Sequence, residues 1–261
     1  MGVQGTQTVM KILILLLLAV VSISSAQRHN RNVIVTPAGG GGPIDTVQTG
    51  GNSLAGVDAF DVTTRTNVTS GNQIFFYVAA YVVTSTDTFV VGDFSKTGTA
   101  TLGTAVLVGG RHTAGGGNEF DTAIWTAAIT GSGTLTMTAA HTPSSNMSGL
   151  AGYAEVENLA GTFDGEGEAA GTGSPVVTGT FSTTAAAFIS GVMCYDVWSA
   201  STVTPEADYT TIFEEEDGTT LVVGSIVFRI STGSLSNESI SWTVSGTGGS
   251  TAWPTVGAAY K

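Results

Sequence analysis

Charged side chains are scarce in this 261-residue sequence, where Lys, Arg, Asp and Glu together make up only 11% of the residues. Eight of them are basic and lie scattered along the chain, and the formal net charge is −12. Binding to nucleic acid or to an anionic membrane surface requires clustered Lys and Arg. The composition therefore argues against a nucleic-acid partner.

Cysteine is almost absent, since Cys194 is the only one in the chain. A lone cysteine cannot form an internal disulfide, so core packing must supply the stability. Cys194 lies in an apolar run, residues 189–198, and such surroundings favour a buried structural thiol over a reactive one.

A helical hydrophobic period is also missing. The chain contains 36 glycines, and Thr, Ser and Val dominate much of the remainder. β-branched residues fit pleated sheets, whereas Gly weakens helix interiors. With turn signals recurring at short intervals from Ile44 onward, the pattern predicts an all-β chain. The expected strands are 44–49, 58–68, 73–84, 87–92, 103–109, 119–130, 134–140, 150–159, 175–182, 186–198, 207–214, 219–231, 239–245 and 254–260.

The chain contains an internal repeat, because residues 57–160 and 175–261 present similar segments in the same order. The apolar strand that begins at Ile74 follows Thr and Ser, and the one that begins at Phe188 follows two threonines. Leu150–Val156 and the closing stretch to Lys261 form a second aligned pair. Residues 161–174, rich in Gly and acid, are interpreted as the linker between the halves.

We expect one large jelly-roll-like β-sandwich over residues 44–261, in which the repeated halves interleave and each donates strands to both sheets. The apolar runs at 74–83 and 187–198 suit central strands buried on both faces, which favours one shared core. The alternative is two tandem Ig-like sandwiches, one for each half.

The N-terminal sequence has the order of a secretory signal. Met10-Lys11 precedes an apolar stretch, residues 12–21, and small residues end at Ala26. This order predicts a signal peptide over residues 1–26, with 1–9 as an upstream extension if Met10 is the start. The apolar stretch is short for a hydrocarbon core of about 30 Å, so a stable membrane span is the weaker alternative. We expect the mature protein outside the cell, or on a cell or particle surface.

Residues 27–43 predict a flexible, Gly-rich N-terminal arm. Within it, Asn32–Thr36 contains the apolar residues Val33, Ile34 and Val35. A short apolar strand on a tether can pair with the open sheet edge of a neighbouring subunit. A disordered mature terminus is the favoured interpretation of this arm, with the pairing strand as the alternative.

Several segments between about Val57 and Lys261 carry a resemblance to other proteins. They are an Ala123-Ile-Trp strand followed by Gly-x-Gly and a Thr-rich strand, Ala-Glu155-Val, Pro175-Val-Val-Thr-Gly-x-Phe, and the closing Trp253-x-x-x-Gly-Ala-Ala-Tyr-Lys. This order resembles a broad group of Gly/Ser/Thr-rich β-sandwich proteins of environmental bacteria and tailed phages. The resemblance implies an extracellular or particle-surface sandwich, and it implies no functional residues.

Candidates for catalysis are few, and we expect no enzyme. His29, His112 and His141 are isolated in the sequence, without the spacing of a zinc site. Glu155 and Glu157 flank Val156, so a strand would place both carboxylates on one face, as a glycoside hydrolase requires. A solvated strand face is the favoured interpretation of this pair.

Asp164, Glu166 and Glu168 alternate with glycine. Such a segment can bend around Ca²⁺, which takes six to eight oxygen ligands. A solvated acidic linker is the favoured interpretation, so no cofactor is expected and calcium stays a hypothesis.

The four tryptophans divide into two pairs. Trp125 and Trp242 lie on alternating strands, which predicts core positions. Trp198 ends a predicted strand and Trp253 lies in a predicted loop, so these two are candidates for stacking on sugar rings. Three asparagines begin Asn-x-Ser/Thr glycosylation sequons, namely Asn67, Asn146 and Asn237.

The sequence favours a non-catalytic secreted β-sandwich with a structural or interaction role. We expect a subunit of an extracellular appendage, a surface layer or a virus particle. It would associate with copies of itself or with other surface proteins through residues 27–43. The alternative is a carbohydrate-binding adhesion module, assisted by calcium.

Overall fold

The computed structural model describes residues 42–82, 88–115, 118–141, 146–196, 201–215, 222–245 and 252–261, which all belong to one compact unit, Val33–Lys261. Most of them form antiparallel strands, as predicted from composition. In these ranges no helix has the length and the hydropathy needed to cross a bilayer.

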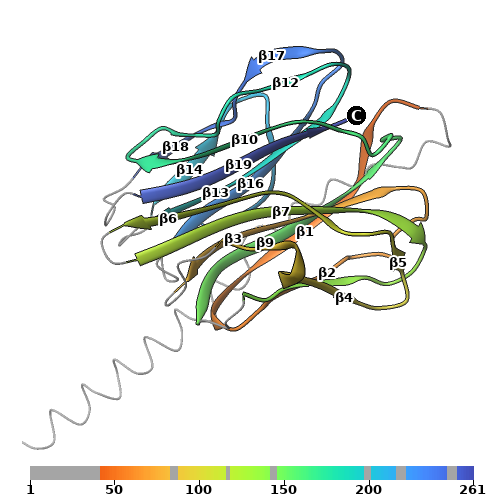
Figure 1. Cartoon of the computed structure of the whole chain (residues 1–261), viewed down its shortest axis with the longest axis horizontal. Helices are drawn as coiled ribbons and strands as arrows, with labels where there is room; N and C mark the ends of the chain where they lie inside the picture. The colour runs from red at the N-terminus through yellow and green to blue at the C-terminus, as the bar shows by residue number, and fades with distance from the viewer. Residues whose placement is uncertain are drawn as a thin grey trace, which may run out of the picture. The chain divides into compact units, whose positions relative to one another are not determined.

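Two sheets form the first half (Figure 1). The large sheet has the order β1-β9-β3-β7, with β5 and β6 both along the outer side of β7. The small sheet has the order β2-β8-β4. The bounds are β1 (Asp45–Val57), β2 (Phe60–Thr63), β3 (Gln73–Val82), β4 (Phe94–Thr97), β5 (Thr101–Leu102), β6 (Val106–Gly115), β7 (Asn118–Gly131), β8 (Thr136–Ala139) and β9 (Met147–Glu157), with a 3₁₀ turn at Val91–Asp93.

The second half repeats this arrangement. Its large sheet has the order β10-β19-β13-β16-β15, its small sheet has the order β11-β18-β14, and β12 pairs with β17. The bounds are β10 (Phe163–Thr172), β11 (Val176–Val177), β12 (Phe181–Thr183), β13 (Phe188–Asp196), β14 (Thr202–Pro205), β15 (Thr210–Glu215), β16 (Val222–Ile230), β17 (Leu235–Glu238), β18 (Ser241–Ser245) and β19 (Ala252–Tyr260).

The predicted all-β sandwich with two repeated halves is therefore confirmed, but the predicted interleaving is wrong. Each half builds its own large sheet and its own small sheet. Both halves have a jelly-roll-like strand order, and in both the strand that follows β4 or β14 joins the large sheet.

The two halves pack through their large sheets, which lie in adjacent layers in Figure 1. The rings of Phe75 and Phe188, on the central strands β3 and β13, have their centroids 4.9 Å apart. Tyr260 places its ring edge-on to Phe75, and Cys194 is fully buried in the same cluster. The predicted shared core and the buried thiol are thus confirmed.

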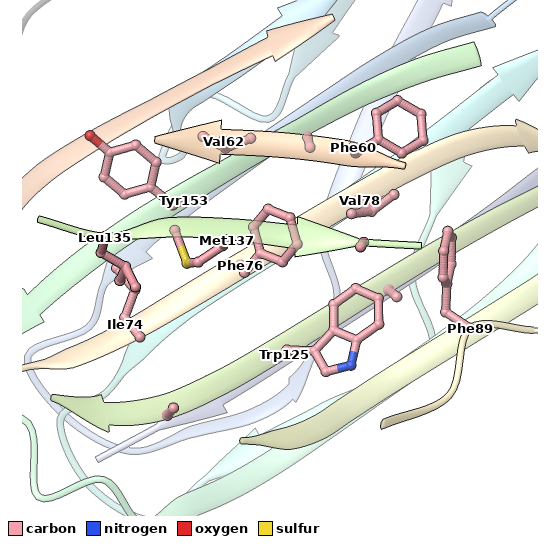
Figure 2. Packing of buried hydrophobic residues seen from close by; sticks show 14 of the residues in the cluster. Phe60, Val62, Ile74, Phe76, Val78, Phe89, Trp125, Leu135, Met137 and Tyr153 are labelled. Carbon is pink, nitrogen blue, oxygen red and sulfur yellow. The ribbon is translucent and has the colours of Figure 1, made fainter. Parts of the chain in front are cut away.

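Each half also has a core between its large and its small sheet. In the first half, Phe60 and Val62 of β2 and Met137 of β8 pack over Phe76 and Trp125 of the large sheet (Figure 2). The corresponding core of the second half contains Trp242, which is fully buried like Trp125. The unit therefore has four layers of sheet and three cores.

The alignment of the repeats from sequence is off by one residue. It matched Ile74 to Phe188, yet Ile74 faces the core of the first half whereas Phe188 faces the shared core. The residue that faces the shared core from the same place on β3 is Phe75. Successive side chains of a strand point to opposite faces, so a shift of one residue exchanges the two sides.

Candidate functional site

Glu155 is fully buried and has three hydrogen-bond donors around its carboxylate. The side-chain amide of Gln48 donates to Oε2 at 2.6 Å. The backbone N–H of Thr69 and the side-chain amide of Asn72 donate to Oε1 at 2.8 and 2.7 Å. Glu155 on β9 thereby fixes residues 64–72, the connection between β2 and β3.

Tyr153 extends this network on the same face of β9. Its hydroxyl donates to Gln48 Oε1 at 3.1 Å and accepts the backbone N–H of Arg65 at 2.9 Å. Burial raises the pKa of Tyr153, against the hydrogen bond from Arg65. Both carboxylate oxygens of Glu155 accept hydrogen bonds from residues that belong to the fold. Glu155 and Glu157 are therefore not supported as a glycosidase pair.

Asp164, Glu166 and Glu168 lie on β10, which pairs with β19 along its length. Residues 163–172 of the predicted linker therefore form a strand, although Glu166 and Glu168 are exposed, as expected of a solvated segment. An edge strand is held by its backbone, so it needs few apolar side chains. Gly167 allows β10 to approach Gly179, whose carbonyl oxygen would lie 2.0 Å from any Cβ added there.

The three acids of β10 have separate partners. Asp164 accepts hydrogen bonds from the backbone N–H and the hydroxyl of Thr184, both at 2.7 Å, and from Lys261 Nζ at 3.0 Å. Burial alone would raise the pKa of Asp164, but these hydrogen bonds outweigh it and the pKa lies below its usual value.

Glu168 reaches from β10 to β6, where it accepts the backbone N–H of Gly110 at 2.9 Å and so joins the two halves. Partial burial, together with the charge of Glu168, raises the pKa of Glu166. Within the described ranges no three acidic, His or Cys side chains come together as metal ligands. The calcium hypothesis thus gains no site on β10.

Trp253 does not lie in an exposed loop. It is part of β19, is only 8% exposed, and its indole N–H donates to the carbonyl of Gly173 at 2.8 Å. The prediction of a sugar-stacking surface at Trp253 is therefore wrong. Trp198 lies outside the described residues, so the carbohydrate hypothesis now depends on a residue without a described position.

The three sequon asparagines are exposed. Asn67 lies between β2 and β3, Asn146 directly precedes β9, and Asn237 lies on β17 with a positive φ of 55°. Their exposure is compatible with modification. The signal segment, the arm and its apolar residues Val33, Ile34 and Val35 lie outside the described residues.

One polar cluster was missed by sequence reasoning. His112 Nδ1 lies 2.9 Å from Asp121 Oδ1, and His112 Nε2 lies 2.7 Å from Glu119 Oε2. His141 Nε2 lies 3.4 Å from the second oxygen of Asp121. Asp121 is fully buried, and the ring of Phe89 packs edge-on against His141. His112 and His141 are isolated in the sequence, but in the structure they share Asp121 as a neighbour.

The hairpin of β6 and β7 explains this cluster, because His112 is paired directly with Asp121 across the ladder. Its signal was present in the sequence: Gly116-Gly117 is a typical two-residue hairpin turn, and such a turn pairs 115 with 118 and therefore 112 with 121. Both ring nitrogens of His112 face carboxylates, so neither is directed at a substrate. The arrangement fastens the hairpin and connects it to the segment after β8.

Comparison of the chain with protein-family models, curated proteins and solved structures found no significant match. The functional argument therefore rests on the residues themselves.

Proposed function

We propose that this chain is a non-catalytic structural β-sandwich that associates with copies of itself through its N-terminal arm. As a secreted protein it would contribute to an extracellular appendage, a surface layer or a particle. The carboxylates Glu155, Asp164 and Glu168, which were candidates for chemistry, bind parts of the fold instead. This supports a structural role.

The observation that carries the proposal is the division of charge along the chain. All 20 acidic residues lie between Asp45 and Lys261, together with only five basic ones. Residues 27–43 contain Arg28 and Arg31 and no acid. The arm is thus basic and the body is acidic, and opposite charges favour and orient association.

The test compares the chain that starts at Gln27 with the chain that starts at Ile44, by size-exclusion chromatography with light scattering and by electron microscopy. We expect multimers for the first, weaker at high salt, and monomers for the second. A longer chain that stays monomeric at high concentration would contradict the proposal. An Arg28→Gln, Arg31→Gln variant separates charge from apolar contacts and is expected to assemble more slowly.

A further inference from the structure

The small sheet of the first half ends in an open edge. The strand β4 pairs with β8 on one side, and in the described part of the chain no strand pairs with its other side. The next long strand, β6, pairs with β7 in the large sheet instead. The outer edge of β4 therefore presents backbone groups that a further strand can pair with.

Apolar side chains are exposed beside this edge. Val90 and Val91, in the segment that leads into β4, are 53% and 54% exposed. Phe94 of β4 packs on the core of the first half, where its ring stacks on Trp125 at 6.3 Å. We call Val90, Val91 and Phe94 the open flank.

The corresponding place in the second half has an edge strand too, β14, but no exposed large hydrophobic of the described residues lies beside it. After β14, Tyr209 turns into the core with only 7% of its surface exposed. The guanidinium of Arg229 lies 5.0 Å from the centre of the Tyr209 ring, and the Tyr209 hydroxyl donates to Glu238. Among the large hydrophobics of the described residues, only Phe163 is exposed in this half.

We propose that the open flank accepts residues 32–36 of a second copy of this chain, which add a strand to the outer edge of β4. This inference rests on the proposed function and names its acceptor. Asn32–Thr36 has five residues and β4 has four, so the two match in length. In an added strand, Val33 and Val35 point to one face, where Phe94 already lies.

The chain connectivity favours the arm of a neighbouring copy. The arm enters the body at β1, and β6 lies at the opposite edge of the large sheet. The two edges are roughly 19 Å apart at about 4.8 Å for each strand. An arm that leaves the body on the far side can reach the flank of a neighbour without crossing its own sheet.

Disulfide trapping tests the pairing. One variant carries Ile34→Cys and a second carries Thr97→Cys, both starting at Gln27, and the two are mixed under mild oxidation. Residues on neighbouring strands have Cα atoms about 4.5–5.5 Å apart, which suits a disulfide. We expect a disulfide-linked heterodimer of the two variants, visible on a non-reducing gel and by mass. Cys194 is fully buried, so the unmodified chain serves as the background.

Thr63→Cys provides the matched control. Thr63 and Thr97 both pair with Thr136, one on each edge of the small sheet, and both are exposed. We expect at least tenfold less heterodimer with Thr63→Cys. Equal or stronger trapping at Thr63 overturns the inference. A chain carrying both Ile34→Cys and Thr97→Cys that closes its disulfide within a monomer also overturns it.

The apolar contacts provide a second measurement. Val90→Thr with Val91→Thr is expected to weaken assembly by about tenfold, because each substitution removes apolar surface from the contact. Phe163→Thr, at an exposed hydrophobic of the second half, is expected to leave assembly unchanged. If the chain from Gln27 assembles but neither trapping at Thr97 nor Val90→Thr with Val91→Thr has an effect, the acceptor is wrong and the proposed function stands. If the chain stays monomeric, both fail.

Discussion

The two halves have the same strand order, yet they hold the same connection in different ways. In the first half, residues 64–72 are bound by the buried carboxylate of Glu155. In the second half, Thr184 in the corresponding connection is bound by Asp164, which also pairs with the partly exposed Lys261. The strand order therefore does not determine how this connection is held. One half uses a buried amide network, and the other uses a nearly buried carboxylate that pairs with a partly exposed lysine.

The small sheets of the two halves also differ beside their edge strands β4 and β14. Val90 and Val91 are exposed next to β4, whereas Tyr209, which follows β14, is buried.

The largest effect is expected where the halves meet. Phe188→Ala removes a ring that is fully buried against Phe75 and Phe228 in the shared core. We expect the free energy of unfolding to fall by about 4 kcal/mol, the usual cost of removing a buried Phe. Urea denaturation should still show one transition, because both halves share this core. A change below about 1 kcal/mol would show that the halves are stable separately.

The second largest effect is expected at Glu155, the buried carboxylate that holds residues 64–72 in the first half. Glu155→Ala leaves Gln48, Thr69 and Asn72 without their acceptor, and we expect a loss of about 3 kcal/mol. Glu157→Ala, two residues along β9 and only partly buried, is the control and should cost less than about 1 kcal/mol. Equal effects of Glu155→Ala and Glu157→Ala in chemical denaturation would contradict the role of Glu155 in holding residues 64–72.

The β6–β7 hairpin is expected to show an intermediate effect. Asp121→Ala removes the fully buried carboxylate that lies between His112 and His141, at an expected cost of about 2 kcal/mol. Glu119→Ala removes the more exposed partner of His112 and should cost less than half as much. Thermal unfolding of the two variants checks this order, and the reverse order would contradict the assignment of Asp121 as the centre of the cluster.

The smallest effect is expected at Asp164, the carboxylate that binds Thr184 and Lys261 in the second half. Asp164→Asn weakens the bonds to Thr184 and Lys261, and should cost less than about 1 kcal/mol at pH 7. The pKa of Asp164 is lowered in the folded state, so its contribution is complete above its ordinary value and is lost as the pH falls through the lowered one. The variant and the original chain should therefore become equally stable in strong acid.

Glu166→Gln is the control of opposite sign on the same strand. The pKa of Glu166 is raised by burial and by Glu168, so ionisation of Glu166 opposes folding as the pH rises through the raised value. Replacement by neutral Gln should slightly stabilise the chain at pH 7. A destabilising Glu166→Gln would contradict this assignment.

The sequence predicted the strands with alternating or continuous apolar residues, because burial dictates their pattern. It failed for β10, whose Asp-Gly-Glu-Gly-Glu segment carries no apolar face and is held by its pairing with β19. It also failed for Trp253, because Trp-Pro suggested a loop. Pro254 is tolerated in β19 since it lies near the start of the strand, where β10 is the strand paired with it.

The candidate sites were harder to predict than the strands. Glu155 looked like half of a catalytic pair, and only the position of residues 64–72 shows that its partners are backbone and amide groups. His112 and Asp121 are nine residues apart, and their contact depends on the turn register of the hairpin. Such contacts depend on tertiary structure that a strand pattern does not contain.

The shared core between the large sheets has a consequence for measurements in dilute solution. It resembles the interface of a dimer, but both partners belong to one chain and are joined through β10. Dilution cannot separate partners that are covalently linked, since their effective concentration is set by the link and not by the sample. Any change of mass with protein concentration therefore reports on contacts between different chains.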